Sequence, residues 1–356
     1  MGDALPDFDG LLDWAALSAW IETAGLPGQG PITEAVKLTG GSQNNLFLLS
    51  RGNERFVLRR PPKHPRKNSN DTMLREARVL GALAGSAVPH PRMLACCADT
   101  SVIGVCFYIM EPLEGFSPVG ALQGRYAEDA SWRHRMGEEF VRAAVALAAV
   151  DYKAVGLEDF GKPDNWHGRQ VERWRSQLDG YRDMPGYAGE ATLPHVDEVG
   201  NWLSAHVPAD GRIGIIHGDF QWPNVMFSLE SPRISGLIDW ELSTLGDPLL
   251  DLAWVLTSWR EPGDPTEGGA SSAPVITPWS GFMNRAELVA LYGELSGRDM
   301  SSMPWFFVLA CYKLACLLEG TYARSLSGQA PKEMGVFLHN YATWLMAKAR
   351  QLMAAV

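Results

Sequence analysis

The segment between residues 213 and 247 constrains the fold and chemistry of this chain more than any other part of the sequence. Two short apolar runs frame it, at residues 213–216 and 234–238, and each has the length of a buried strand. Asp219 and Asn224 follow the first run, and Asp239 closes the second. We therefore expect two neighbouring strand ends that bring two carboxylates and one amide close together.

These residue types suit one division of labour. Oxygen atoms of carboxylate and amide side chains are the ligands that Mg²⁺ prefers in proteins, so Asn224 and Asp239 are candidate metal ligands. Asp219 would then stay free to accept a proton from an incoming hydroxyl group. Phosphoryl transfer from a nucleotide needs both functions. Because Asp and Asn also form turns between strands, a turn without chemistry is the alternative on these residues alone.

A longer pattern runs through the same segment. Residues 217–224 read H-G-D-F-Q-W-P-N, and residues 238–240 read I-D-W. In this order the two motifs resemble the catalytic and metal-binding segments of the aminoglycoside phosphotransferase family, a branch of the protein-kinase-like fold. The resemblance implies that Asp219 is the catalytic residue, that Asn224 and Asp239 hold Mg²⁺, and that ATP is the nucleotide.

The same resemblance implies an α+β fold with two lobes. The N-lobe, residues 1–112, would combine a small antiparallel β-sheet with a helix and cover the nucleotide, after an N-terminal helix at residues 9–24. The C-lobe, residues 113–356, would be mainly helical and would carry the catalytic loop and the acceptor-binding region. Its expected helices lie at residues 133–150, 171–181, 196–206, 284–295, 304–326 and 333–353, and the glycine and proline content of residues 260–281 predicts a long loop.

A polar turn lies between two strand-like runs within residues 36–50, and it contains Gly41, Ser42 and Asn44. Glycine permits backbone turns that aim amide groups at phosphate oxygens. On its own the segment is also typical of an ordinary polar hairpin. Its position resembles that of the family's nucleotide-covering loop, which implies that these residues contact the phosphates of ATP.

Arg59 lies in a predicted strand at residues 55–60, where kinases carry the lysine of V-A-I-K. Arginine also pairs with phosphate, in a forked geometry. Glu76 lies in a predicted helix at residues 71–83, capped by Asn70 or Asp71, and it occupies the place of the family's paired glutamate. The resemblance implies an Arg59–Glu76 ion pair that holds the guanidinium toward the phosphates; an exposed surface glutamate is the alternative.

Two predicted strands, at residues 93–98 and 102–110, lead into the sequence M-E-P-L-E-G. This sequence resembles the hinge between the lobes, which implies that the Glu111 carbonyl and the Leu113 amide contact the adenine edge. The runs F-V-L-R-R-P-P and V-I-G-V-C-F-Y-I-M-E-P-L-E-G also resemble the kinase-like modules joined to acyl-CoA dehydrogenases. Downstream, Asp251 is expected to brace the catalytic loop by accepting hydrogen bonds from main-chain amides.

Composition and charge bear on the binding class, the location and the state of the cysteines. The formal net charge of −10 argues against a nucleic-acid-binding protein, which usually carries a basic face. The N-terminal residues lack the pattern of a secretory signal, and no uninterrupted apolar run approaches the length of a membrane span, so a cytoplasmic location is the default expectation. The five cysteines show no C-x-x-C spacing, which favours free, buried thiols.

The sequence therefore predicts an ATP- and Mg²⁺-dependent kinase that phosphorylates a hydroxyl group of a small molecule. Aminoglycosides, other amino alcohols and hydroxyacyl thioesters all agree with the resemblance, and the oligomeric state is open. One alternative is a pseudokinase that binds nucleotide without turnover, for which Arg59 in place of lysine is the main argument. A metal-dependent hydrolase built on His217 and Asp219 ranks lower, because further ligands are lacking and Glu241 was expected to be poorly placed.

Overall fold

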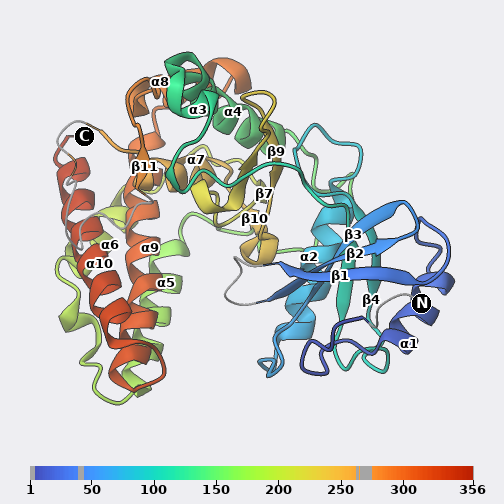
Figure 1. Ribbon diagram of the computed structural model, residues 1–356. Helices are drawn as coiled ribbons and strands as arrows, with labels where there is room; N and C mark the ends of the chain where they lie inside the picture. The colour runs from blue at the N-terminus through green and yellow to red at the C-terminus, as the bar shows by residue number, and fades with distance from the viewer. Residues whose placement is uncertain (1–4, 39–43, 262–263, 265–274, 356) are drawn as a thin grey trace.

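The computed structural model describes residues 5–38, 44–261, 264 and 275–355. The chain forms two lobes, a sheet-rich N-lobe and a larger helical C-lobe, joined by the segment that follows the fifth strand (Figure 1). This is the predicted α+β arrangement, with one lobe built on an antiparallel sheet and the other mainly helical.

The N-lobe is a five-stranded antiparallel sheet in the order β1-β2-β3-β5-β4. The strands are β1 (Ile32–Leu38), β2 (Asn45–Arg51), β3 (Glu54–Arg60), β4 (Met93–Cys97) and β5 (Phe107–Met110). Helix α1 (Trp14–Thr23) contributes Leu17 and Ile21 to the apolar core on one face of the sheet. Helix α2 (Ser69–Ala82) contributes Met73 and Leu80 to the core on the opposite face.

Strand β3 shows how the sequence period sets the two faces. Phe56 and Leu58 belong to the core that includes α1, whereas Val57 belongs to the core that includes α2. Arg59 shares the face of Val57 because side chains alternate along a strand. It pairs with Tyr108 on β5 and with Leu46 on β2. The guanidinium of Arg59 is thereby directed toward α2.

The C-lobe surrounds the catalytic segment with helices. They are α3 (Arg125–Glu128), α4 (Ala130–Ala148), α5 (Gln170–Asp179), α6 (Val196–Ala205), α7 (Leu249–Ser258), α8 (Arg285–Ser296), α9 (Met303–Leu326) and α10 (Lys332–Met353). Short strand pairs lie among them: β7 (Gly214–Ile216) with β10 (Thr244–Gly246), β8 (Val225–Phe227) with β9 (Ile234–Leu237), and β6 (Gly120–Ala121) with β11 (Ile276–Thr277). The apolar runs that frame the catalytic segment are thus strands, as predicted, but each pairs with a different partner.

Helix α9 is long and apolar enough to cross a membrane by length and composition alone, contrary to the expectation from sequence. However, 72% of its most apolar window is buried inside the protein. Its charged residues Lys313 and Glu319 are also buried, and both make hydrogen bonds within the C-lobe. These contacts are typical of the central helix of a folded lobe.

Several element boundaries differ from the sequence prediction; the first helix, expected at residues 9–24, is α1 at Trp14–Thr23. Strand β5 begins at Phe107, because the residues before it form turns closed by the hydrogen bond from Gly104 to Thr100. Helix α2 begins at Ser69, and Asn68 occupies the cap position without a side-chain capping bond. Asp71 therefore lies in the first helical turn rather than at the cap. All five cysteines are free, as expected.

Helix α2 joins the two lobes as well as covering the sheet. The Arg75 guanidinium donates to the carbonyl oxygens of Phe160 (2.9 Å) and Ser243 (3.3 Å), which both belong to the C-lobe. Arg78 forms an ion pair with Asp159. Helix α2 is therefore held from both sides, by the sheet that it covers and by the C-lobe beside it.

The connection between the lobes depends on a glycine. Gly115 has a φ of +136°, and a Cβ atom at this position would lie 2.2 Å from the carbonyl oxygen of Phe227. The next residue, Phe116, exchanges two backbone hydrogen bonds with Phe227 (3.0 and 2.8 Å). Only a residue without a side chain fits between the connecting segment and β8.

We predict that Gly115→Ala lowers the free energy of unfolding by about 3 kcal/mol, because it adds a steric clash to an unfavourable backbone conformation. Gly104→Ala is the matched control, since Gly104 also has a positive φ (+83°) but faces open space. It should cost about 1 kcal/mol. Urea unfolding of both variants tests this, and equal losses would show that the contact with Phe227 does not constrain the hinge.

Candidate active site

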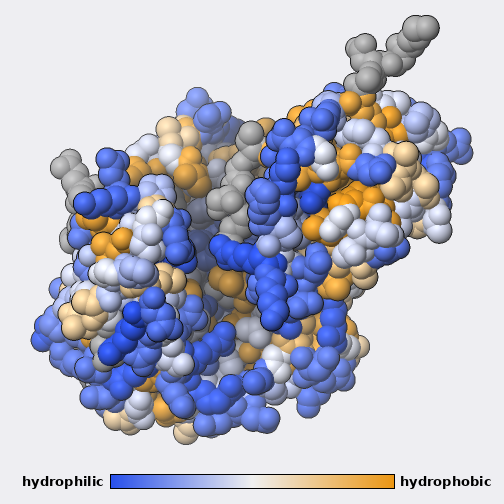
Figure 2. Space-filling view, turned by 90° about the horizontal axis from the view of Figure 1, so that it is seen from below, coloured by the Kyte–Doolittle hydropathy of each residue, from blue (hydrophilic) through white to orange (hydrophobic). Residues whose placement is uncertain are grey.

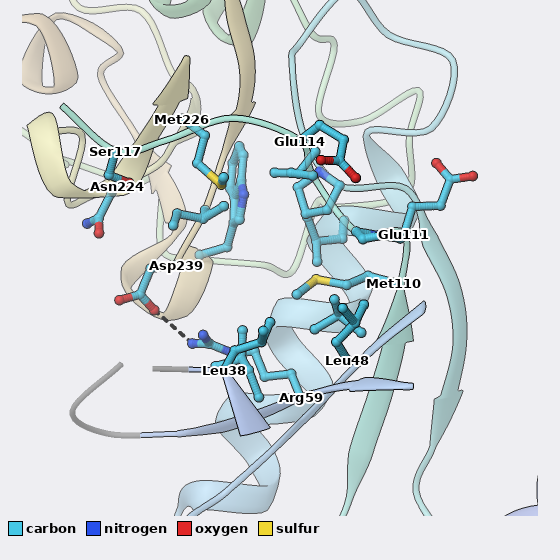
Figure 3. A pocket seen from close by; sticks show the side chains of 18 of the residues that line it. Leu38, Leu48, Arg59, Met110, Glu111, Glu114, Ser117, Asn224, Met226 and Asp239 are labelled. Carbon is cyan, nitrogen blue, oxygen red and sulfur yellow. Dashed lines mark hydrogen bonds and ion pairs between the residues drawn. The ribbon is translucent and has the colours of Figure 1, made fainter. Parts of the chain in front are cut away.

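A cleft of about 710 Å³ lies between the two lobes (Figure 3). Figure 2 shows a hollow between the two lobes, with hydrophilic residues along its rim. Apolar side chains from both lobes form much of its wall: Leu38, Leu46, Leu48, Val57, Met110, Met226, Ile238 and Trp240. A slot of this kind, between a sheet and a strand pair, suits a flat aromatic ring, and the polar groups at one end suit its charged substituents.

Arg59 lies at the polar end of the cleft and contacts both lobes. Its Nε atom is 2.8 Å from Glu76 Oε2, and a terminal nitrogen is 2.7 Å from Asp239 Oδ1, the contact drawn in Figure 3. Glu76 is fully buried and also accepts a hydrogen bond from the Tyr108 hydroxyl (2.9 Å). The predicted Arg59–Glu76 ion pair is therefore present.

The charge of Arg59 is maintained by its neighbours. Burial acts to lower its pKa, but Tyr108, Glu76 and Asp239 act in the opposite direction and hold the pKa above its ordinary value. The guanidinium is thus a fixed positive charge at the point where the two lobes meet.

Asp219 lies at the end of β7, and its carboxylate is held by three side-chain donors. Oδ1 accepts hydrogen bonds from Gln221 Nε2 (2.7 Å) and Trp254 Nε1 (3.0 Å), and Oδ2 accepts one from Asn224 Nδ2 (2.7 Å). The residue is only partly buried. A carboxylate that is fixed in direction and open on one side can accept a proton from a bound hydroxyl group.

Two buried charged side chains, Asp251 and Lys313, hold the loop that carries Asp219. The Asp251 carboxylate, 2% exposed, accepts hydrogen bonds from the main-chain amides of His217 (2.7 Å) and Gly218 (3.0 Å). The predicted bracing role of Asp251 is confirmed. On the other side, Lys313 Nζ donates to the carbonyl oxygen of Gly218 (2.9 Å). The amide and the carbonyl of Gly218, directly before Asp219, are therefore held by side chains of opposite charge.

His217 is a structural residue of this loop. Its ring is fully buried, and its Nε2 atom lies 3.0 Å from the carbonyl oxygen of Ile238. Because a carbonyl oxygen only accepts hydrogen bonds, Nε2 carries the hydrogen. The imidazole thus links the two catalytic segments and does not join Asp219 in a site, which argues against the hydrolase alternative.

Asn224 and Asp239 both line the cleft, on the side of the C-lobe (Figure 3). The amide nitrogen of Asn224 is committed to the backbone and side-chain oxygens of Asp219, so the amide oxygen is left for another partner. Asp239 has left-handed backbone angles (φ 65°, ψ 65°), and its side chain is 38% exposed. These two oxygen donors fit a hard divalent cation in chemistry and position.

Glu241 is a residue of the site that sequence reasoning undervalued. One oxygen atom each from Glu241, Asp239 and Glu76 lie within 4.8 Å of one another, which is a suitable spacing for one ion. Burial and the nearby Asp239 carboxylate raise the pKa of Glu241 to about 7. The Glu241 carboxylate thus lies beside those of Asp239 and Glu76, and the expectation that it is a poor third ligand stays a prediction.

The remaining predicted site residues belong to the connecting segment and to the turn before β2. Glu111 and Leu113 line the cleft where the connecting segment leaves β5, and the Glu111 side chain pairs with Arg92. Asn44 lies in a bend directly before β2. Gly41 and Ser42 lie outside the described residues. Sequence reasoning missed Gln221, Trp254 and Lys313; only the short distance between Asp219 and Gln221 offered a signal.

The sequence profile described as "Phosphotransferase enzyme family" matches residues 34–273, which include the cleft and the loop that carries Asp219. The chain belongs to this phosphotransferase family. Its resemblance to the aminoglycoside phosphotransferases, which was stated from the motifs, is thereby confirmed.

Curated relatives of this phosphotransferase include larger proteins. Acyl-CoA dehydrogenase family member 10 of Mus musculus is 31% identical over 315 residues, which are 85% of this chain and 27% of the relative. Acyl-CoA dehydrogenase family member 11 of Gallus gallus is 31% identical over 309 residues, which are 83% of this chain and 37% of the relative. The phosphotransferase chain thus spans about a third of these relatives, and the predicted likeness to their kinase-like modules is confirmed.

Solved structures share the fold of this phosphotransferase. A Ralstonia eutropha protein, provisionally named an aminoglycoside phosphotransferase, superposes with a TM-score of 0.79 at 29% identity and covers 96% of this chain and 98% of its own. A thermostable mutant of aminoglycoside phosphotransferase APH(4)-Ia, in a ternary complex with AMP-PNP and hygromycin B, gives a TM-score of 0.56 at 16% identity, covering 96% and 98% of the two chains. The second likeness shows the fold alone.

We predict that Arg59→Met lowers the free energy of unfolding of this phosphotransferase by about 3–5 kcal/mol, because it leaves the buried Glu76 carboxylate without its counter-charge. The double variant Arg59→Met/Glu76→Met should recover most of this loss, since it removes the unpaired charge as well. Arg55→Met is the control: Arg55 lies on the same strand and pairs with Glu114, which is 83% exposed, so the effect should stay within about 0.5 kcal/mol. Equal stability of the single and double variants would contradict the prediction.

Proposed function

We propose that this chain transfers the γ-phosphoryl group of ATP to a hydroxyl group of a small molecule, with Mg²⁺ as the cofactor. The observation that carries the proposal is the arrangement around Asp219: a carboxylate held by three donors, one of which is the amide of Asn224. Asn224 in turn lines the same interlobe cleft as Asp239 and Arg59. Family membership supports phosphotransfer as the class of reaction.

Asn224 and Asp239 would hold Mg²⁺, with Glu241 as a further ligand. When bound, the ion supplies neutralisation of the charge on the phosphate oxygens. The fit rests on the free amide oxygen of Asn224 and on the grouping of the Asp239 and Glu241 carboxylates. Arg59 would provide a second positive charge for the phosphates from the opposite lobe, positioned by Glu76.

Asp219 would orient the acceptor hydroxyl group and accept its proton as the phosphoryl group moves. The bonds from Gln221, Trp254 and Asn224 hold the carboxylate in one orientation, which removes the cost of aligning it during the reaction. The adenine ring would lie between the apolar walls of the cleft, next to the main chain of Glu111 and Leu113. A solved relative of the same fold binds AMP-PNP, which supports a nucleotide in this cleft.

A second candidate function is favoured by the Arg59–Asp239 ion pair. This contact (2.7 Å) engages one of the two metal-ligand candidates, and arginine is bulkier than the lysine that kinases carry at this position. A pseudokinase would bind the nucleotide, keep this ion pair, and transfer no phosphoryl group. Slow ADP release, measured with and without hydroxylated compounds, separates the two functions: a pseudokinase gives none above the rate in protein-free buffer.

The acceptor that we propose is a small hydroxylated molecule. An aminoglycoside, another amino alcohol and a hydroxyacyl thioester are all candidates by family likeness. Two curated relatives at 31% identity carry the name of acyl-CoA dehydrogenases, so an acceptor that is not an antibiotic is preferred. A screen of hydroxylated compounds with coupled detection of ADP tests the proposal directly.

We predict that Asp219→Asn lowers the turnover number by about 10²–10⁴-fold, the usual contribution of a general base. The affinity for ATP should stay unchanged, because Asp219 is not among the residues that line the nucleotide cleft. Turnover is measured by ADP release and affinity by calorimetric titration of a non-hydrolysable ATP analogue. Asp210→Asn, an exposed residue in the loop before β7, is the control. Unchanged turnover in Asp219→Asn would remove this residue from the role of base.

We predict that Asp239→Ala abolishes the dependence of nucleotide binding on Mg²⁺, because it removes a carboxylate ligand of the ion. Titration of Mg²⁺ at a constant concentration of the ATP analogue measures this effect. Glu114→Ala serves as the control, since Glu114 also lines the cleft but is 83% exposed at its mouth. A normal Mg²⁺ titration in Asp239→Ala would show that the metal is held elsewhere.

A further inference from the structure

The hydrogen bonds to Asp219 distinguish its two carboxylate oxygens. An ionised carboxylate offers about four lone-pair sites, two on each oxygen. Oδ1 accepts hydrogen bonds from Gln221 Nε2 (2.7 Å) and Trp254 Nε1 (3.0 Å), which together fill both of its sites. Among the residues that the structure describes, Oδ2 has one side-chain donor, Asn224 Nδ2 (2.7 Å). The remaining site on Oδ2 is therefore the place where this carboxylate can receive a proton.

Trp254 is the donor that comes from outside the catalytic loop. Gln221 and Asn224 follow Asp219 in the same loop, whereas Trp254 lies on α7, a helix that is buried over its whole length. Its indole ring is itself buried. Because the indole cannot move with the loop, its hydrogen bond ties the direction of the Asp219 carboxylate to the helical part of the C-lobe.

The face of this indole carries a buried positive charge. Lys313 lies on α9, which packs against α7, and its Nζ atom is 4.2 Å from the centroid of the Trp254 ring. The same Nζ atom donates to the carbonyl oxygen of Gly218 (2.9 Å), directly before Asp219. A cation over the face of an indole is attracted to the ring electrons, and polar groups in series polarise one another in a protein interior. The ammonium group should thus strengthen the indole N–H as a donor to Asp219.

The charge on Lys313 depends on its surroundings. Burial lowers the pKa of Lys313 to about 8, with Arg173 on α5 acting in the same direction and Asp251 and Asp219 acting against it. Lys313 is therefore charged below about pH 8 and neutral above it. When the ammonium group loses its proton, the indole loses its cation, and the hydrogen bond to Asp219 should weaken.

We propose that Trp254 and Lys313 form a positioning pair, which fixes Asp219 so that its Oδ2 atom accepts the proton of the phosphoryl acceptor. The inference rests on the proposed function, because it concerns an atom that acts in that reaction. The O–H bond of the acceptor breaks and the proton passes to Oδ2, while the acceptor oxygen forms a bond to the γ-phosphorus. The bond between this phosphorus and the bridging oxygen breaks, and ADP leaves with the electron pair. Both members of the pair act through Asp219.

The first test removes the indole N–H group. Trp254→Phe should lower the kcat for ADP release, with water as the acceptor, by about 10–100-fold, the effect of losing a hydrogen bond to a charged group. The KM for ATP should not change, because Trp254 is not among the described residues that line the interlobe cleft. A smaller loss of alignment than this would leave kcat close to that of the control described next.

Trp174→Phe is the matched control for Trp254→Phe. Both indoles are buried, at 5% and 2% exposure, and Lys313 Nζ also lies near the Trp174 ring, at 5.5 Å. The Trp174 Nε1 atom, however, donates to Gln170 Oε1 (3.3 Å) and not to Asp219. Trp174→Phe should therefore keep the kcat of the wild-type protein. An equal kcat in the two variants would overturn the positioning role of Trp254.

The second test observes the Trp254 N–H group without any reaction. Its signal in the NMR spectrum of the full chain is assigned by its loss in Trp254→Phe. At neutral pH the signal should lie further upfield in Lys313→Met and in Asp219→Asn than in the wild-type protein, because the hydrogen bond is weaker in both. It should also move upfield in the wild-type protein as the pH rises through about 8, and this movement should be absent in Lys313→Met. A signal at the same position in the wild-type protein and Lys313→Met would overturn the role of Lys313.

The dependence of kcat on pH gives a readout that a purely structural role would not change. In the wild-type protein kcat should fall as the pH rises through about 8, because Lys313 becomes neutral, and Lys313→Met should lack this fall. The NMR signal separates the failure of this inference from the failure of the proposed function. If no ADP is released but the signal depends on Lys313 and Asp219, the coupling of the three side chains stands and the kinase activity fails. If ADP is released and Trp254→Phe matches its control, the kinase activity stands and the positioning pair fails.

Discussion

One buried guanidinium connects the two lobes of this protein. Arg59 extends from the sheet, contacts Glu76 on α2, and crosses the cleft to Asp239. A charge with so little exposure is tolerated only when opposite charges and hydrogen bonds surround it. The fold meets this condition by placing three separate segments, β3, α2 and the turn after β9, around a single side chain. The position of α2, which Arg75 also ties to the C-lobe, is therefore linked to the geometry of the interlobe cleft.

The catalytic loop is stabilised by a second set of buried charges. Asp251 holds the amide side of the His217–Gly218 segment, and Lys313 holds the carbonyl side of Gly218. Gly218 itself has a φ of +82°, and an added Cβ would lie 2.3 Å from the carbonyl oxygen of Leu242. The amides of His217 and Gly218 and the carbonyl of Gly218 thus have fixed partners, which hold the backbone directly before Asp219.

Sequence reasoning predicted most of the framework, because the apolar runs that form β2 and β3 can be recognised in the sequence and the H-G-D and I-D-W motifs have characteristic spacing. It also predicted that Glu76 would meet Arg59. The remaining parts of the site depend on geometry that the sequence does not display. Trp254 lies in a helix that is mostly apolar and fully buried, so it is typical of a core position, although its indole nitrogen reaches Asp219. Lys313 is similarly hidden in the apolar α9, and the direction of Glu241 depends on the left-handed turn at Asp239.

The nitrogen and the oxygen of the Asn224 side-chain amide have different roles. Its nitrogen donates to Asp219, and its oxygen is the end left for a cation. A carboxylate of the same shape could serve the cation equally well, but it would place two negative oxygens at the 2.7 Å distance now occupied by a hydrogen bond. An amide is the only planar side chain of this length that is a donor on one edge and an acceptor on the other. In the proposed reaction, the separation between the proton acceptor and the cation would consequently be set by the width of one amide group.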